Sequence, residues 1–163
     1  MVRRRLEEWK DEDFSCKVKI VEVKDFDKLT ESLEGQLTNY DVLLSTMGGL
    51  TAQGEVVLTN IEYNYPAAFA KSGLSQGAKH FGILSACNAD VKSSMVAVRL
   101  KGEIERHFPA FGYPSLSFAR PGLITNREGE RLIEKICKYI PFIPKVDSND
   151  IAIAMFEDAI LAS

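Results

Sequence analysis

Cysteine is scarce in this chain, and the few cysteines present follow no functional spacing. Cys16, Cys87 and Cys137 are odd in number and match neither a metal-binding nor a redox motif. We therefore predict reduced thiols in a reducing compartment. Cys87 lies beside the candidate site described below, but unpaired cysteine is most often simply buried. We accordingly predict that Cys87 is a buried residue without a chemical role.

Long apolar runs and a surplus of positive charge are also missing. No stretch approaches the roughly 20 apolar residues of a membrane-spanning helix, so we predict no membrane span. The formal net charge of −3 argues against nucleic acid as the main partner. The two histidines, His80 and His107, stand far apart without ligand spacing, so we assign no metal site.

The first residues lack the pattern of a targeting signal. Residues 1–5 are basic but have no apolar core, which excludes a signal peptide. Acidic residues follow at once over residues 7–13, and this argues against an import presequence. We therefore predict a cytoplasmic protein, with the nucleus also open to a chain of this size.

The chain does have the composition of an ordinary globular domain. Of its 163 residues, 45% are hydrophobic and 26% are charged. A chain of this length buries roughly 70% of its unfolded surface, so it needs no disulfide or metal to fold. We predict one domain over residues 1–163.

Runs typical of strands alternate with runs typical of helices. We expect strands over residues 18–24, 40–46, 79–85 and 113–120. We expect helices over residues 27–37, 59–75, 91–108, 130–139 and 150–161. Thr51–Val57 is expected to form a loop, and Pro66 to kink or split the second helix. Ser148 or Asn149 is expected to cap the last helix.

The stretch around Ser85 carries the clearest chemical pattern. The apolar run Phe81–Leu84 fits a buried parallel strand, and Ser85 follows at its carboxyl end. Ligands bind at that edge in open α/β sheets. Lys101 lies on the next predicted helix. A serine at a strand end and a lysine on the following helix form the skeleton of a reductase site, where lysine holds a ribose and lowers the pKa of a neighbouring tyrosine.

Six short segments in a fixed order match a known family. They are Val23–Leu29, Tyr40–Val42, Lys79–Phe81, Lys92–Ser94, Leu100–Glu103 and Arg120–Gly122. On these segments the chain resembles the short-chain dehydrogenase/reductases, whose site is a serine plus Tyr-x-x-x-Lys, and more narrowly their atypical branch of Tat-interacting oxidoreductases. The resemblance implies a truncated Rossmann-like α/β fold in three layers, with a mostly parallel sheet of about four to five strands flanked by helices.

Carried over residue by residue, the resemblance assigns a catalytic pair and a set of contacts to NADP(H). The catalytic pair is Ser85 and Lys101. The cofactor contacts are Arg3, Arg4, Asp25, Phe26, Thr46, Met47, Gly48, Ser85, Lys101, Pro121, Gly122 and Leu123. In the family, the arginine pair binds the 2′-phosphate, and the Asp-Phe pair lies against the adenine.

The residues alone leave other roles open for the same positions. Asp25 could cap the helix that follows it. Gly48 with Gly49 fits any tight turn as well as a ligand loop. Arg120–Gly122 could be a strand-ending turn, and Arg3 with Arg4 could belong to a solvated tail or a short helix.

Two departures from the family pattern bear on function. Ala97 stands four residues before Lys101, where the family has its tyrosine. The family's first strand and glycine-rich loop would lie before Met1, so the main anion site is missing and we predict weak or no NADP(H) binding. The strand at 40–46 also loses a neighbour. We expect the strand at 18–24 to move in beside it; a dimer and an unstable fragment are the second and third alternatives.

These features support two hypotheses of function, and a third interpretation is a non-functional paralogue or a truncated gene product. In the first, the chain is a degenerate reductase-like protein that acts as a regulatory or protein-binding module. The resemblance then implies nuclear import or growth control, with an import receptor as the partner and a homodimer as a further option. Changes on the surface of the final helix should weaken such binding. The alternative is an active NADPH-dependent oxidoreductase that acts on a small carbonyl substrate through Ser85 and Lys101.

Overall fold

Three parallel strands form the centre of the computed structural model, which describes residues 2–3, 21–49, 51–125 and 144–162. They are β3 (Val42–Ser45), β4 (His80–Leu84) and β5 (Ser115–Ala119), in the order β3-β4-β5. Val42 pairs with His80, and His80 pairs with Ser115. β4 lies in the middle with a neighbouring strand on each side, which is why its first four residues are all buried.

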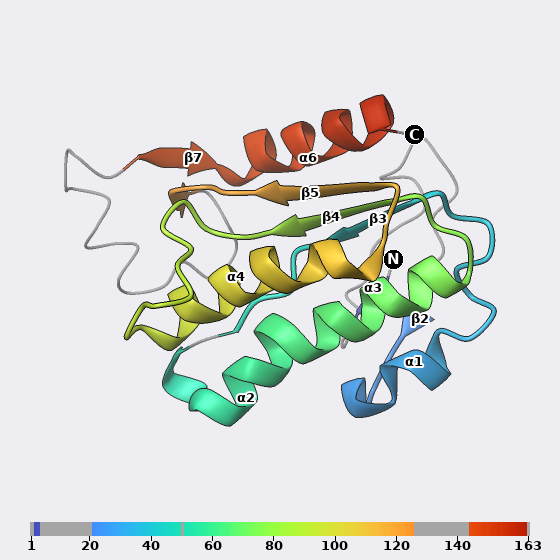
Figure 1. The fold of residues 1–163 in the computed structure, drawn as a ribbon, viewed down its shortest axis with the longest axis horizontal. Coiled ribbons are helices and arrows are strands. Elements are labelled where there is room, and N and C mark those ends of the chain that lie inside the picture. Colours follow the sequence, from blue (N-terminus) through green and yellow to red (C-terminus); the bar gives the residue numbers. More distant parts are fainter. Residues whose placement is uncertain (1, 4–20, 50, 126–143, 163) are drawn as a thin grey trace.

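Helices cover both faces of this sheet (Figure 1). One face carries a helical layer made of α2 (Glu55–Thr59), the π-helical segment η4 (Asn60–Asn64), α3 (Tyr65–Ser75) and α4 (Val96–His107). The other face is covered by α6 (Ser148–Ala162), which packs on β4 and β5. The predicted α/β fold with a parallel sheet between helical layers is confirmed.

The apolar core lies between the sheet and the layer of α3 and α4. Phe81 on β4 is fully buried there, and its ring contacts the rings of Phe69, Phe108 and Tyr113. Buried aromatic rings contribute large apolar areas and favour tilted or edge-to-face contacts. This cluster therefore holds the helical layer on the sheet and fixes the strand ends that carry the site.

Short elements complete the described fold. They are β1 (Val2–Arg3), β2 (Val21–Glu22), η2 (Phe26–Lys28), α1 (Leu29–Ser32), η3 (Thr51–Gln53), η5 (Phe108–Phe111), β6 (Leu123–Thr125) and β7 (Lys145–Asp147). β6 and β7 form a parallel pair, and β1 pairs in parallel with β2.

The expected move of the strand at 18–24 to the edge of the central sheet is wrong for the residues that the structure describes. β2 pairs with β1 and not with β3. The chain after β2 is held elsewhere, because Val23, Leu29 and Leu33 are buried in the same core cluster as α3. Residues 18–20 lie outside the described part of the chain.

Several predicted helix boundaries are also corrected. The expected loop at 51–57 instead contains η3 and the start of α2. The helical run is divided just before Pro66, because the π-helical turns of η4 accommodate a residue that has no backbone N–H. The predicted helix at 27–37 is reduced to η2 and α1, and the one at 130–139 lies outside the described residues.

Hydrogen bonds from backbone N–H groups to side chains explain where two helices begin. α4 starts at Val96 and not at residue 91, because Asp90 accepts the Lys92 N–H and Ser93 accepts the Met95 N–H in local turns. The last helix starts at Ser148, and Asp147 caps it by accepting the Asn149 N–H at 2.8 Å. No helix within the described ranges combines the length and the apolarity that a bilayer crossing requires.

Candidate functional site

Ser85 occupies the position expected for it, directly beyond the carboxyl end of β4. It is buried, and its backbone N–H donates to the Ala119 carbonyl at 2.7 Å, which continues the pairing with β5. Its hydroxyl donates to Oε1 of Glu105 on α4 at 2.6 Å. The serine hydroxyl is therefore bound to a carboxylate of the same chain.

Glu105 joins α4 to the segment that follows β5. Arg120 donates from Nε to Glu105 Oε1 at 2.8 Å and from Nη2 to Oε2, in a bidentate pair. This hydrogen bond, helped by the charge of Glu105, raises the pKa of Arg120 above its ordinary value. The pair ties the ends of β4 and β5 together through one carboxylate.

Lys101 lies one helical turn before Glu105 and reaches the same strand end. Its Nζ donates to the Leu84 carbonyl at 2.7 Å and forms an ion pair with Glu62 Oε2 at 2.7 Å. The side chains of Lys101 and Glu62 are only 12% and 7% exposed. The ammonium is therefore held in place and neutralised within the protein.

Glu62, on η4, extends the network to the end of β3. Its second oxygen, Oε1, accepts the Gly49 N–H at 2.8 Å. A Cβ on Gly49 would lie 2.9 Å from Leu58 Cδ1, so this glycine allows the helical layer to approach the strand end closely. One polar network thus crosses the carboxyl ends of all three central strands.

The tyrosine position of the family pattern is occupied by Ala97 in the first turn of α4. Ala97, Lys101 and Glu105 are four residues apart and share one face of the helix. The hydroxyls of three described tyrosines are engaged elsewhere: Tyr63 with His107, Tyr65 with Asp27 and Tyr113 with Ala70. Burial raises the pKa of Tyr113 to about 12.

The predicted adenine contacts have internal partners. Asp25 caps η2 by accepting the Asp27 N–H at 3.1 Å, which is the structural role that the sequence left open. The Phe26 ring packs on Tyr65 with a centroid distance of 5.4 Å. Arg3 lies in β1, and Arg4 lies outside the described residues.

The glycine-containing loops after β3 and β5 are close to protein atoms. Thr46 and Gly48 are exposed after β3, and Met47 packs against the core. A Cβ on Gly122 would lie 2.2 Å from the Pro144 carbonyl oxygen, and the Leu123 N–H donates to the same oxygen at 2.8 Å. Gly122 therefore permits the close packing of β6 against the start of β7.

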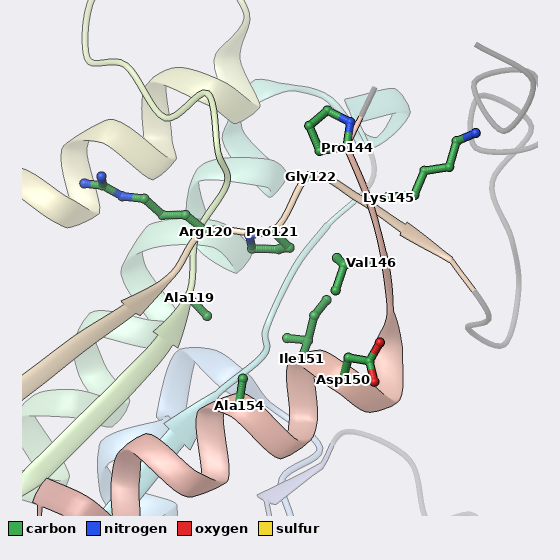
Figure 2. Close-up of a pocket in the computed structure, with 10 residues that line it drawn as sticks. All are labelled: Ala119, Arg120, Pro121, Gly122, Pro144, Lys145, Val146, Asp150, Ile151 and Ala154. Carbon is green, nitrogen blue, oxygen red and sulfur yellow. The ribbon is translucent and has the colours of Figure 1, made fainter. Parts of the chain in front are cut away.

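A pocket of about 360 Å³ lies beside this packing, between Pro121 and α6 (Figure 2). Figure 2 shows Val146 and Ile151 inside it, while the Arg120 and Lys145 side chains point away. The full lining is Ala119, Arg120, Pro121, Gly122, Pro144, Lys145, Val146, Asp150, Ile151 and Ala154. Its interior is thus mostly apolar, as small-molecule pockets commonly are.

The prediction that Cys87 is buried is wrong. Cys87 is exposed in the turn-rich loop between β4 and α4. Its backbone N–H donates to the Pro121 carbonyl at 3.0 Å, which fixes the main chain and leaves the side chain at the surface. Cysteine is generally buried, but the geometry of this loop places the Cys87 side chain at the surface.

Sequence comparison identifies relatives of this chain, although no family model matches it. It is 31% identical to Protein HTATIP2 of Rattus norvegicus over 128 residues, which are 74% of this chain and 52% of that protein. It is 30% identical to FMP52-2 of Scheffersomyces stipitis over 146 residues, 85% of this chain and 62% of that protein. The chain is a homologue of HTATIP2 and FMP52. It spans only about half the length of HTATIP2.

Solved structures show the fold of this HTATIP2 homologue. UDP-glucose 4-epimerase of Thermotoga maritima, solved with UDP-glucose, matches with a TM-score of 0.69 at 11% identity, over 95% of this chain and 63% of that one. A short-chain dehydrogenase/reductase mutant of Serratia marcescens matches with a TM-score of 0.65 at 14% identity, over 89% and 70%. These structures confirm the predicted Rossmann-like fold, and the match to HTATIP2 confirms the predicted kinship with the Tat-interacting proteins.

The predicted cytoplasmic or nuclear location is wrong. Several FMP52 relatives, including those of Emericella nidulans and Candida albicans, are named as mitochondrial proteins. The prediction relied on acidic residues soon after a basic start, and the relatives overturn that argument.

The described residues do not fit NADP(H) as they stand. Lys101 and the Gly49 N–H are bound by Glu62, and the Ser85 hydroxyl is bound by Glu105. Gly122 and Gly49 are packed on protein atoms, whereas Gly48, the glycine predicted as a cofactor contact after β3, is exposed. The lysine and serine donors expected to hold a dinucleotide therefore already have partners within the chain.

Proposed function

We propose that this chain is a non-catalytic relative of the short-chain dehydrogenase/reductases that works by binding other proteins and has little or no affinity for NADP(H). One observation carries the proposal. The lysine and the serine of the reductase pattern are both held by carboxylates of the chain, and the helix turn before the lysine carries Ala97. The methyl group of Ala97 cannot donate a proton to a carbonyl.

The loss of this donor affects rate directly. General acid catalysis contributes roughly 10²- to 10⁴-fold, and three described tyrosine hydroxyls are hydrogen-bonded away from Lys101. Ser85 keeps its hydroxyl, but the bond to Glu105 at 2.6 Å directs its proton toward a carboxylate. These side chains are therefore arranged to stabilise the strand ends, and they are poorly arranged to reduce a carbonyl.

Thermal unfolding of the 163-residue chain with NADPH tests the cofactor part of the proposal. A ligand that binds the folded state raises stability by RT ln(1 + [L]/Kd), so about 1 mM NADPH should leave the midpoint unchanged if affinity is lost. A clear upward shift would contradict the proposal. NADPH consumption with small aldehydes and ketones is the parallel measurement, and we expect none above a protein-free blank.

The surface of α6 supports a role in protein binding. Ile153, Phe156 and Leu161 are exposed there, and the charged residues of this helix are all acidic. A surface of this kind fits an apolar segment that carries basic residues. The more specific prediction of an import receptor as partner, and that of a homodimer, stay predictions.

A synthetic amphipathic peptide of leucine and lysine is a suitable probe of this surface. We expect binding in fluorescence anisotropy that is weakened at least about tenfold by Phe156→Asp, and no binding of the matching leucine–glutamate peptide. Equal binding by the parent chain and the variant would contradict the assignment. Sedimentation of the chain alone over a range of concentrations separates self-association from binding of the peptide.

An active NADPH-dependent reductase is the second candidate. It is favoured by the meeting of Ser85 and Lys101 at one strand end, as in the family pattern. It requires carbonyl-dependent NADPH consumption that Lys101→Ala abolishes.

A further inference from the structure

Glu62 is a buried carboxylate at the edge of the sheet where ligands bind in this class of fold. Its two oxygens are shared between two elements: Oε2 pairs with Lys101 on α4, and Oε1 accepts the backbone N–H of Gly49 after β3. An ammonium and a backbone N–H beside a glycine are groups that commonly bind anions. Here an anion is already present, and it belongs to the protein.

The local structure explains why Glu62 reaches both groups. It is in the middle of the π-helical segment Asn60–Asn64, which widens the helix between α2 and α3. π-helical turns are rare and are found mostly at functional sites. Gly49 completes the arrangement, since a side chain there would meet Leu58 and hold η4 away from the strand end.

The charges determine which ligands this edge accepts. Lys101 donates to the Leu84 carbonyl and pairs with Glu62, so the buried pair carries no net charge. A phosphate group entering here would meet a carboxylate of the same sign. Displacing Glu62 would leave its charge buried without a partner, which is strongly unfavourable.

We propose that Glu62 is a built-in anion that occupies Lys101 and the Gly49 N–H and thereby keeps an anionic dinucleotide from using them. The inference rests on the proposed weak binding of NADP(H) and assigns part of that weakness to one residue. Neutralising Glu62 should therefore restore affinity for an anionic nucleotide, even though Ala97 still prevents chemistry.

The test is the affinity of Glu62→Gln for NADPH, measured by thermal shift and by fluorescence titration. Glutamine has nearly the same shape and can still accept the Gly49 N–H, but it leaves Lys101 with a net positive charge. Because one nearby charge changes an ionic equilibrium by about 1 to 3 log units, we expect NADPH to bind roughly tenfold more tightly or better. The gain should shrink as salt is raised.

Glu55→Gln is the matched control. Glu55 lies in the same helical layer and pairs with Arg99 at 2.7 Å, but its side chain is exposed. This variant loses the same formal charge and should gain no affinity. An equal gain in both variants would overturn the proposal, because it would reflect net charge alone.

The remaining outcomes also decide the matter. A folded Glu62→Gln protein that binds no better than a non-binding parent chain overturns the role of Glu62 and leaves the proposed function intact. A parent chain that already binds NADPH tightly overturns both. If Glu62→Gln fails to fold, Glu62→Met replaces it: the side chain has a similar length but no charge, and the absence of a severalfold gain in a folded Glu62→Met protein overturns the proposal.

Discussion

At the scale of single residues, His80 predicts how stability depends on pH. It is fully buried at the start of β4, with Nδ1 2.9 Å from Ser115 Oγ and Nε2 3.3 Å from Ser117 Oγ. Burial lowers the pKa of His80 below its ordinary 6.5, and Asp158 on α6, 3.9 Å from Nε2, opposes this only in part. The unfolded chain therefore binds a proton near pH 6.5 that the folded chain does not.

The free energy of unfolding should consequently fall as the pH drops below 6.5, by at most about 1.4 kcal/mol per pH unit for one proton. Urea unfolding between pH 7 and 5 measures this slope. His80→Asn can keep a hydrogen bond to Ser115 and should flatten it. An unchanged slope in His80→Asn would show that other groups cause it.

The residues of the site were only partly predictable. Ser85 and Lys101 were located correctly, because a strand end and the following helix bring them together whatever else the chain does. Glu62 and Glu105 were missed, since helical periodicity does not say which carboxylate reaches a given strand end. The four-residue spacing of Lys101 and Glu105 was the available signal. The cofactor roles assigned by resemblance stay predictions.

At the scale of elements, α6 allows a sharp comparison between neighbours. Met155 is 6% exposed on the side that faces the sheet, whereas Phe156 is 61% exposed. We expect Met155→Ala to lower the free energy of unfolding by about 2 to 5 kcal/mol, because it leaves a cavity under the helix. Phe156→Ala should change it by about 0.5 kcal/mol or less.

Urea unfolding at several protein concentrations measures both variants of α6. A large cost for Phe156→Ala that depends on concentration would mean that a second copy covers this face. A small cost for Met155→Ala would mean that α6 contributes little to the stability of the sheet.

Elements that lie in long sequence patterns were predicted, and very short elements were missed. β3, β4 and β5 lie within the predicted ranges. β3 and β4 contain apolar runs typical of buried parallel strands, and β5 alternates between polar and apolar residues, which is also a strand pattern. β6 and β7 are three residues each and carry too little pattern to be recognised. The start of α4 was missed because Asp90 and Ser93 hold the preceding residues in turns that periodicity does not reveal.

At the scale of the whole molecule, we predict that the chain unfolds as one domain. A single core cluster includes buried residues from Val23 before η2 to Phe108 after α4, and Phe81 lies at its aromatic centre. Phe81→Ala should lower the free energy of unfolding by about 3 to 5 kcal/mol, which is a large part of the roughly 5 to 15 kcal/mol typical of a domain. Phe81→Leu keeps most of the volume and should cost less.

Far-ultraviolet circular dichroism and tyrosine fluorescence together test whether the chain unfolds as one domain. Tyrosine fluorescence reports on the core because Tyr113 contacts the Phe81 ring. In a single cooperative unit, both signals report the same midpoint, and both midpoints shift equally in Phe81→Ala. If the fluorescence midpoint shifted and part of the dichroism did not, the segments outside the central sheet would form a separate unit. The network of Glu62, Lys101, Ser85, Glu105 and Arg120 would then depend on the central sheet alone. Ser85 and Arg120 directly follow β4 and β5, and the other three residues lie on the helical layer that packs on the sheet.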